Sequence, residues 1–317
     1  MADTAAAQAG PPSGAGLPAA PPDLSPKFRP GEQLIKLVLV LSAVTSVAIT
    51  FGIIAAVIEP AVKFFDEVPF SQFFATEDIG SKEIRPAVVP LIVGTFLTTV
   101  VALALAVPLG LGAAMYLSEY ASPRARKWLK PTVELLAGVP SVVYGFFAVF
   151  FVTPVVLNGW LGLEVNFTNS LSAGLVLGVM IIPTVASLSE DALSAVPQAL
   201  RQGSLAMGAN RMQTTLRVVL PAALSGVAAA VVLGLSRAVG ETMIVTMAGG
   251  AVKNMSLDVG EPHMTMTAFI AITAGGENPV GSVSYNMLFA VGLLLFIMTF
   301  IMNAISIYFV RRFRQVY

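Results

Sequence analysis

Six long apolar runs, separated by shorter polar stretches, set the pattern of this chain. Each run is long enough to cross a hydrocarbon layer of about 30 Å, which takes around 20 helical residues. The pattern therefore predicts an all-α membrane protein with six transmembrane helices. The runs cover residues 34–58, 87–117, 135–157, 171–188, 222–250 and 287–310.

Proline interrupts three of these runs, at Pro108, at Pro140 and Pro154, and at Pro183. Inside a bilayer, such breaks persist only where neighbouring helices or a water-lined cavity satisfy the freed backbone groups. The helices are therefore expected to pack into a bundle rather than to stand alone in lipid.

The two ends of the chain differ from the runs. Residues 1–33 are rich in Ala, Pro and Gly and hold few large apolar side chains, so they are predicted to form a disordered tail. This tail lacks the early basic region and short apolar core of a cleavable signal peptide, which makes run 34–58 a retained first transmembrane helix. Residues 87–310 form the expected core domain, and residues 311–317 form a short basic C-terminus.

Composition supports a membrane protein and removes several function classes. Hydrophobic residues make up 56% of the chain and charged residues only 11%, against about 25% charged residues in a soluble domain. Basic and acidic residues are equal in number, 18 each, which gives no reason to expect nucleic acid as a partner. The chain has no Cys and a single His, His263, so disulfide scaffolds, thiolate chemistry and His/Cys metal sites are excluded. His263 falls in the last outer loop, where a solvent-exposed side chain is expected.

The Lys and Arg residues between the runs indicate orientation. By the positive-inside rule the side that holds most of them, together with both termini, is cytoplasmic. The opposite connections, 59–86, 158–170 and 251–286, are acidic or polar and could meet an extracytoplasmic partner. The basic side holds Lys27, Arg29, Lys36, Arg124, Arg126, Lys127, Lys130, Arg201, Arg211, Arg217, Arg311, Arg312 and Arg314, and the opposite side holds Lys63, Lys82, Arg85 and Lys253.

The connection between the fourth and fifth runs, residues 189–221, has the composition of a helix rather than of a loop. Pro197 can begin a helix at its first turn, and Gly208 can end it where a positive φ is needed. The predicted short amphipathic helix would lie below the bilayer and could dock in a groove of a soluble partner. Its narrow face is formed by Leu200, Ser204 and Met207.

This connection resembles the "EAA" cytoplasmic loop of permease subunits from ATP-binding-cassette (ABC) importers. In that family a Gly stands a fixed distance before a hydrophobic-X-Leu-Pro ending, and here Gly208 precedes Val218, Leu220 and Pro221 at that distance. The leading Glu-Ala-Ala is absent, because Gln202, Gly203 and Ser204 stand in its place. The resemblance implies that this loop contacts an ATPase subunit, through Leu200, Gln202, Ser204, Met207, Gly208 and Pro221.

Three further stretches resemble the phosphate-specific permease subunits of the PstC type within that superfamily. They are ELLAGVPSVVYGFFA, MIIPTVASLSEDAL and LSRAVGETMIV, and the resemblance extends over about residues 87–310. It implies a type I importer bundle of six helices with a coupling helix between helices four and five. It also implies a multi-pass protein of the cytoplasmic membrane of a bacterium or archaeon.

The same resemblance implies a division of labour among partners. An extracytoplasmic phosphate-binding protein (PstS-like) delivers inorganic phosphate, this chain and a second related permease (PstA-like) form the pathway within membrane lipid, and two ATPase subunits (PstB-like) drive transport. The chain has no G-x-x-x-x-G-K-[ST] loop, so it lacks the Walker means of binding ATP. It is therefore expected to be a transport subunit and not an enzyme, with no cofactor of its own and with ATP and Mg²⁺ held by the ATPase.

The fifth run holds two charges, Arg237 and Glu241. Charged residues in membrane helices usually face the bundle interior or a wet cavity, because Arg at the helix centre costs about 2.5–3.5 kcal/mol on insertion scales. Four positions apart, the two residues share a helix face and can pair, at a depth past the midplane toward the outside. They form either a structural ion pair or a site where Arg237 contacts phosphate in passing. Other pathway residues are Thr242, Ser141 and Tyr144.

Two alternatives remain open from the sequence. A permease for another oxyanion, such as sulfate or molybdate, would carry a similar cytoplasmic loop, although the stretches GVPSVVYG and SRAVGET favour phosphate. A self-contained secondary transporter would require inverted repeats or a chain of buried ionisable groups. The sequence shows no internal repeat and a single charged pair inside the runs.

Overall fold

The computed structural model describes residues 30–77 and 86–312, and every regular element in these ranges is helical. This confirms the predicted all-α fold. The predicted disordered tail, except for its last residues from Pro30, and residues 313–317 of the basic C-terminus lie outside the described residues. The elements are α1 (Pro30–Glu67), α2 (Phe70–Phe73), α3 (Val89–Met115), η1 (Tyr116–Tyr120), α4 (Pro123–Leu136), α5 (Ser141–Phe147), η2 (Ala148–Trp160), α6 (Ser170–Ser194), α7 (Gln198–Ala206), α8 (Arg211–Thr214), η3 (Thr215–Val219), α9 (Leu220–Ala222), α10 (Leu224–Gly240), η4 (Val245–Gly249), α11 (Met266–Ala274) and α12 (Val283–Arg312), where η marks π-helical segments.

Within residues 30–77 and 86–312, five helices are long and apolar enough to cross a membrane. They are α1, α3 with η1, α5 with η2, α6 and α12. A sixth candidate is a bent pair, Arg211–Ala222 and Leu224–Gly240, whose two parts meet at 73°. The six predicted runs therefore each correspond to a helix or a broken helix.

The chain divides into two structural units, residues 1–52 and residues 53–317. In the first unit, the described part of α1 is an apolar helix whose side chains are exposed along its length. The second unit holds the bundle. The last turns of α1 belong to it, because Phe64 is fully buried in a cluster with Phe73, Leu91 and Met266.

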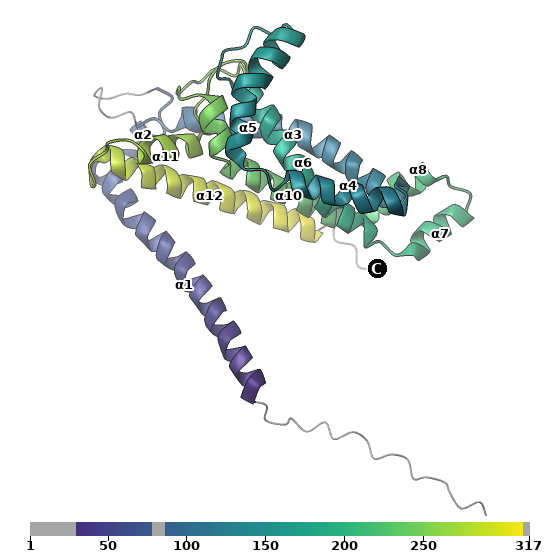
Figure 1. Cartoon of the computed structure of the whole chain (residues 1–317). Helices are drawn as coiled ribbons and strands as arrows, with labels where there is room; N and C mark the ends of the chain where they lie inside the picture. Colours follow the sequence, from purple (N-terminus) through teal and green to yellow (C-terminus); the bar gives the residue numbers. More distant parts are fainter. Residues whose placement is uncertain (1–29, 78–85, 313–317) are drawn as a thin grey trace, which may run out of the picture. The chain divides into compact units, whose positions relative to one another are not determined.

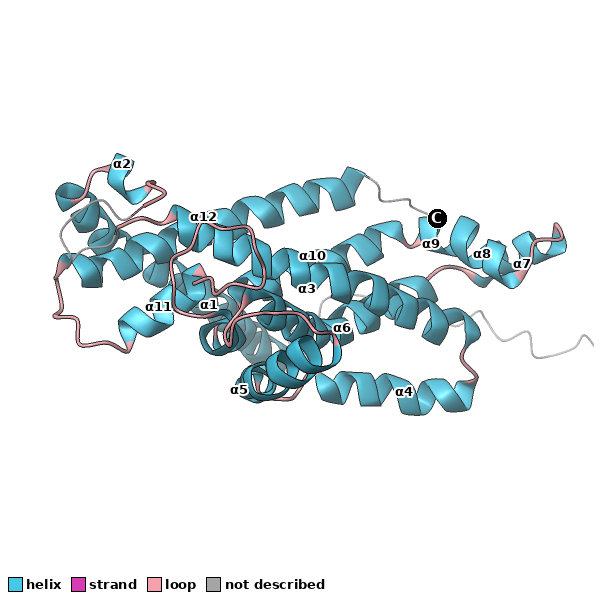
Figure 2. Ribbon diagram, turned by 90° about the horizontal axis from the view of Figure 1, so that it is seen from above, coloured by secondary structure: helices cyan, strands magenta, loops and turns pink. Residues whose placement is uncertain are grey.

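Helices α3, α6, α10 and α12 run side by side in the second unit (Figures 1 and 2). The most extensive interface joins α3 to α6. Glycines let the two backbones approach closely there. A Cβ atom added at Gly174 would lie 2.6 Å from the Cβ of Val101, and one added at Gly178 would lie 2.8 Å from the carbonyl oxygen of Ala102.

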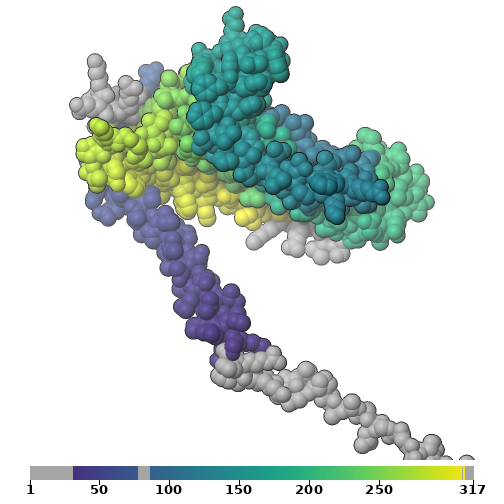
Figure 3. All heavy atoms as spheres, in the orientation of Figure 1, coloured from purple at the N-terminus to yellow at the C-terminus, as the bar shows by residue number. Residues whose placement is uncertain are grey.

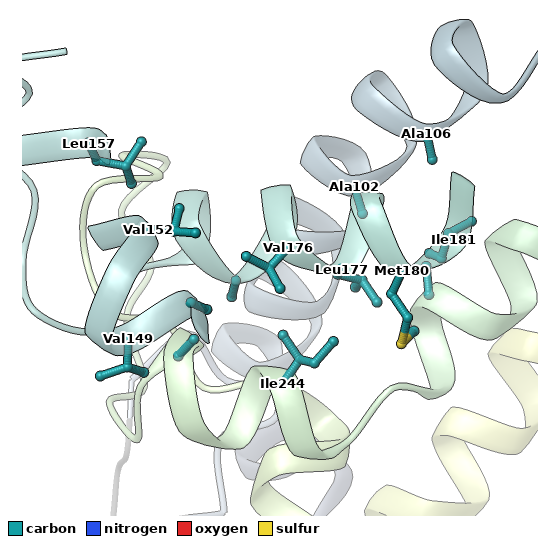
Figure 4. Packing of buried hydrophobic residues seen from close by; sticks show 14 of the residues in the cluster. Ala102, Ala106, Val149, Val152, Leu157, Val176, Leu177, Met180, Ile181 and Ile244 are labelled. Atoms are coloured by element: carbon teal, nitrogen blue, oxygen red, sulfur yellow. The ribbon is translucent and has the colours of Figure 1, made fainter. Parts of the chain in front are cut away.

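The main apolar core lies where α6 meets its neighbours (Figure 4). Leu177, Met180 and Ile181 of α6 are buried there, against Ala102 of α3 and Ile244, which precedes η4. Buried side chains from α3, η2, α10 and η4 surround those of α6 and fix it in the centre of the bundle. Polar residues on the remaining faces of α6 are held in place by this packing.

The predicted third run, 135–157, is not one helix. Its first residues, Leu135 and Leu136, end α4, and α5 begins only at Ser141. Gly138 and Pro140 explain the break, because proline disfavours helical backbone in the residue before it. Figure 1 shows α5 running across the direction of α4.

The predicted fifth run, 222–250, is also broken. Helix α10 ends at Gly240, Glu241 has extended backbone (φ −67°, ψ 132°), and η4 follows from Val245. In addition, the polar connection that was predicted as 251–286 contains a short helix, α11. The two breaks lie in the stretches GVPS and VGET, and each leaves backbone groups that need other partners.

The connection between α6 and α10 is helical, as predicted. Pro197 directly precedes α7, and Gly208 ends this segment with a φ of +87°, a conformation that costs glycine little. Asn210 then begins α8 with a capping box, in which its side chain and that of Gln213 satisfy each other's backbone N–H. In the space-filling view, α7 and α8 form one end of the second unit (Figure 3). We call this end, which includes Arg126 and Lys130 of α4 and Arg201 of α7, the basic end.

The prediction of an exposed His263 is wrong. His263 has no exposed surface, and its Nε2 lies 2.8 Å from the carbonyl oxygen of Ser256. Its Nδ1 lies 3.0 Å from the hydroxyl of Ser170 and 3.0 Å from the carbonyl oxygen of Glu261. The side chain thus satisfies backbone groups of the loop before α11 and ties this loop to the start of α6, which sequence spacing alone does not reveal.

Candidate functional site

Arg237 lies in the last turn of α10, and its side chain is exposed. Its Nη1 donates to the hydroxyl of Thr184 on α6 across 3.1 Å. A cation near the C-terminus of a helix also interacts favourably with the helix dipole. One hydrogen bond and the dipole hold the guanidinium, so most of its five N–H donors stay free for another group.

The backbone break beside Arg237 is stabilised from two sides. The carbonyl oxygen of Glu241 accepts from the hydroxyl of Thr267 at 2.7 Å. The Glu241 carboxylate accepts from the backbone N–H groups of Met243 and Ile244, at 3.0 and 3.3 Å. It therefore caps the helical turn that follows the break, as carboxylates commonly do at helix N-termini.

The predicted pairing of Arg237 with Glu241 is wrong for this structure. Spacing of four residues brings side chains together only within a continuous helix, and α10 ends at Gly240, between the two. Arg237 instead contacts Thr184, and Glu241 contacts backbone N–H groups.

The level of Arg237 in the bundle is given by its contact with Thr184. Thr184 lies 14 residues after Ser170 and 10 residues before Ser194, the ends of α6, which are distances of about 21 Å and 15 Å along the helix. Arg237 is therefore level with the middle part of α6. Its depth past the midplane toward the outside stays a prediction.

A row of polar side chains runs along α6 from this level to the basic end. We define this polar stripe as Thr184, Ser187 and Asp191, which are spaced by three and four residues and so share one helix face. Each member meets a charged side chain. Thr184 accepts from Arg237 at 3.1 Å, Ser187 donates to Glu134 at 3.3 Å, and Asp191 accepts from Lys130 at 2.6 Å.

The strongest charge pairing along the polar stripe is at Asp191, next to the basic end. Hydrogen bonds to Asp191 and then to Glu190 raise the pKa of the Lys130 ammonium above its usual value, although partial burial opposes the shift. Lys130 therefore stays charged at any physiological pH. None of the described residues forms a group of three or more His, Asp or Glu side chains that could hold a metal ion.

The other predicted pathway residues lie near the breaks. Ser141 is the first residue of α5. The hydroxyl of Tyr144 donates to the carbonyl oxygen of Leu136 at 3.0 Å, which satisfies the broken end of α4. Thr242 lies at the break after α10, and its carbonyl oxygen accepts from Thr246. A pathway role for these three residues stays a prediction.

The three residues of the predicted narrow face of α7 differ in their burial. Leu200 packs against a buried cluster under α7, and Ser204 lies 2.9 Å from the hydroxyl oxygen of Thr214. Met207, in contrast, is 89% exposed. Of the residues predicted to contact an ATPase, those with exposed side chains are therefore Gln202, Met207 and Pro221, while Gly208 is an exposed turn.

Sequence reasoning missed a buried charge cluster at the basic end. Glu190 has no exposed surface and accepts from Arg126, from Lys130 at 2.6 Å and from Ser194 at 2.8 Å. A second pair joins Arg201 of α7 to Glu119 of η1 at 2.9 Å, with side chains 10% and 8% exposed.

The signal that could have found this cluster is charge balance. The basic residues of α4 are matched by the acids Glu190 and Asp191, and a buried charge requires a partner. Nothing in the sequence, however, indicates which acid meets which base, because Arg126 and Glu190 are 64 residues apart.

Comparison with known proteins agrees with this architecture. The sequence model of the family described as "Binding-protein-dependent transport system inner membrane component" matches residues 106–315. A Bacillus subtilis (strain 168) protein described as "Probable ABC transporter permease protein YqgH" is 39% identical over 216 residues, which cover 68% of this chain and 68% of that protein.

Other relatives are described as phosphate transport permeases. The "Phosphate transport system permease protein PstC 1" of Mycobacterium tuberculosis (strain ATCC 25618 / H37Rv) is 37% identical, with 70% of this chain and 72% of that protein covered. PstC of Mesorhizobium japonicum is 34% identical, with the same coverage of 70% and 72%.

Solved structures share the fold. A chain of a bacterial alginate ABC transporter, solved with an alginate-bound periplasmic protein, has a TM-score of 0.63 at 17% identity and covers 90% of this chain and 98% of its own. A chain of the MetNI methionine ABC transporter in an inward-facing conformation has a TM-score of 0.53 at 21% identity and covers 72% of this chain and 94% of its own. At such identities the likeness concerns the fold alone.

Proposed function

Because the chain belongs to the family of inner-membrane components of binding-protein-dependent transport systems, we propose that it carries inorganic phosphate through an ATP-driven importer. The family makes it a multi-pass inner-membrane permease without catalytic activity, which works with an ATPase and a binding protein. The choice of phosphate is supported by the relatives described as phosphate permeases, at 32–37% identity for those of the PstC type.

The observation that carries this proposal is the position of Arg237. Arg237 ends α10 but lies level with the middle of α6, and an exposed arginine at that level of a membrane bundle is expensive unless it faces a wet cavity or a partner. It lies beside a helix break, and transport sites are commonly built from such discontinuous helices near the bilayer midplane. The planar guanidinium with free donors suits phosphate oxygens, which it can bind in a bidentate manner.

The polar stripe supports the direction of the path. Thr184, Ser187 and Asp191 continue from Arg237 toward the basic end. Thr184 and Ser187 are half-buried and Asp191 is exposed, and polar side chains that are not fully buried on a membrane-spanning helix require water or a second protein surface. We infer that a second, related permease (PstA-like) covers the far side of this path and that the anion passes between the two subunits.

Glu241 would keep the site weak. A carboxylate at the break after α10 repels an anion, and a pathway must release what it binds. One Glu241 oxygen is occupied by the backbone N–H groups of Met243 and Ile244. The other oxygen could accept the proton that phosphate keeps at neutral pH and that sulfate lacks, which gives a physical basis for choosing phosphate.

The two ends of the bundle give the positions at which the remaining partners would dock. We propose that the basic end is cytoplasmic, as the positive-inside rule requires, and that both termini lie on this side. Two ATPase subunits (PstB-like), which hold the ATP and Mg²⁺, would dock at α7 and Gly208. A phosphate-binding protein (PstS-like) would dock at the outer end, where the His263 loop lies.

Uptake into proteoliposomes tests the substrate. The complete complex with its binding protein and internal ATP should accumulate labelled phosphate, and unlabelled sulfate or molybdate in excess should leave this uptake unchanged. ATP-dependent uptake of sulfate or molybdate without uptake of phosphate would overturn the proposal and assign the chain to another oxyanion.

A further inference from the structure

The basic end contains two buried charge clusters that meet at one point. The first joins Arg201 of α7 to Glu119 of η1. The second surrounds Glu190 of α6 and includes Arg126 and Lys130 of α4. Together they connect α7, the predicted ATPase-docking helix, with α4. Lys130 and Glu134 of α4 in turn contact Asp191 and Ser187 of the polar stripe.

Arg201 holds three elements at once. Its Nε and Nη2 both donate to Oε1 of Glu119, at 3.1 and 2.9 Å. Nη2 also donates to the carbonyl oxygen of Leu193 at 2.7 Å, and Nη1 donates to that of Val196. These carbonyls belong to the last turn of α6 and the residues just after it, where a cation satisfies otherwise unpaired acceptors. The side chain therefore fastens α7 to both η1 and the end of α6.

Glu190 joins α4 to α6 in the same way. Oε1 accepts from Arg126 and from the hydroxyl of Ser194, and Oε2 accepts from Lys130 at 2.6 Å. The carboxylate is fully buried, and the two cations together compensate its charge. Helices α4 and α6 are thus held together at two successive turns of α4.

The two clusters meet through Ser118 and Ser194. Each serine has one proton to donate; Ser118 is placed to donate to Glu119 at 3.2 Å, and Ser194 to Glu190 at 2.8 Å. The two hydroxyl oxygens are 3.4 Å apart. Side chains from η1, α4, α6 and α7 therefore meet here through polar groups, next to the apolar cluster in which Leu200 of α7 packs.

From this arrangement we propose that Arg201, Glu119 and Glu190 are positioning residues that make α4, α6, η1 and α7 one rigid coupling unit. When the ATPase moves α7, the whole unit moves, and Glu134 and Lys130 of α4 shift with it along the path below Arg237. The inference rests on the role of the family, an ATP-driven permease, and does not depend on which anion is carried.

Cysteine cross-linking tests the rigidity directly, and the chain has no native Cys to interfere. In the complete complex, Ser118→Cys combined with Ser194→Cys places two thiols where the hydroxyls are 3.4 Å apart, close enough for a disulfide after a small adjustment. We expect the disulfide to form at rates within about twofold in the nucleotide-free and ATP-trapped complexes, since a rigid unit keeps one geometry. Rates that differ by about tenfold or more would overturn the proposal.

Glu119→Gln tests the coupling. We expect the complex to assemble in normal amount and to hydrolyse ATP, while substrate uptake per ATP falls by about tenfold, the upper range for single residues of a coupling network. A purely structural role would lower complex yield and leave uptake per ATP unchanged, and that result would contradict the proposal. The matched control is Glu59→Gln, which removes a carboxylate from a pair at 2.8 Å that is exposed in α1.

The two experiments separate this inference from the proposed substrate. Cross-linking uses no transported anion, so its outcome stands even where phosphate is not carried. Failure of wild-type phosphate uptake would count against the proposed function alone, whereas unequal cross-linking rates would count against the coupling unit alone.

Discussion

Arg237 donates to the hydroxyl of Thr184 across 3.1 Å, and this hydrogen bond joins the end of α10 to the middle of α6. Glu241, four residues further on, contributes nothing to it and instead caps the next turn. The cation and the carboxylate are thus held by separate partners, which leaves both able to meet an anion that passes the break.

Thr184→Val removes the acceptor without changing the size of the side chain. We expect substrate uptake to fall by about tenfold, because a hydrogen bond to a charged group contributes about 1.5–3 kcal/mol and the guanidinium would lose its fixed position. Initial uptake rates in proteoliposomes measure this. Thr132→Val is the control, since its hydroxyl bonds only to the carbonyl oxygen of Trp128 within α4. Equal uptake in the two variants would contradict a role for Thr184.

Glu241→Gln tests the basis of anion choice. The amide oxygen can still accept from Met243 and Ile244, so the cap is preserved, while the free carboxylate oxygen is replaced by a donor. We expect the preference for phosphate over sulfate to narrow by about tenfold or more, the value of one hydrogen bond to a charged group. Parallel uptake assays with both anions give the ratio, and an unchanged ratio would refute the proton-acceptor role.

Glu190 and Asp191 allow the effect of burial on the stability of a charge pair to be compared. Both accept from Lys130 at 2.6 Å, yet Glu190 has no exposed surface and Asp191 is 59% exposed. Glu190→Gln should lower the free energy of unfolding by about 1–3 kcal/mol, because a buried acceptor shared by Arg126 and Lys130 is lost. Asp191→Asn should cost at most about 1 kcal/mol. Thermal unfolding of the detergent-solubilised protein compares them, and similar losses would show that burial of Glu190 is unimportant.

The Lys130 pairing should not make this stability depend on pH in the physiological range. Its pKa is raised above 10.5 in the folded protein, so its contribution is fully present below the unfolded value and is lost only as the pH rises through the folded value.

Gly208→Trp should separate the ATPase from the membrane subunits. Gly208 has a φ of +87° and open space around it, so a large side chain would strain the turn and project from the docking surface. Co-purification of the ATPase measures the effect. Gly162→Trp is the control, because Gly162 has a φ of +64° and similar open space in an outer loop. Full ATPase recovery with Gly208→Trp would refute docking at this turn.

The fold was largely predictable because membrane helices must satisfy their own backbone groups. Length and hydropathy therefore located the five candidate spans and the bent pair among the described residues, and local chemistry predicted the turn at Gly208 and the helix start at Pro197. These features depend on residues close in sequence.

The site was less predictable because its contacts span long separations. Residues on both sides of Glu241 are apolar, so hydropathy continues through the break, and the groups that satisfy it include Thr267, which is 26 residues away. The pairing of Arg237 with Thr184 and the burial of His263 also depend on which helices become neighbours. The spacing of residues along one helix cannot predict these contacts, because they join different helices and loops.

Phosphate uptake by an Arg237 variant tests the central claim most directly. Arg237→Ala, purified with its partners and compared with Arg124→Ala, an exposed arginine at the start of α4, is assayed for ATP-dependent uptake of labelled phosphate in proteoliposomes. We predict normal assembly of both variants and a loss of about a hundredfold in uptake for Arg237→Ala alone, as expected when a charge-assisted contact to the anion is removed. Uptake by Arg237→Ala equal to that of Arg124→Ala would contradict the assignment of Arg237 to the phosphate path.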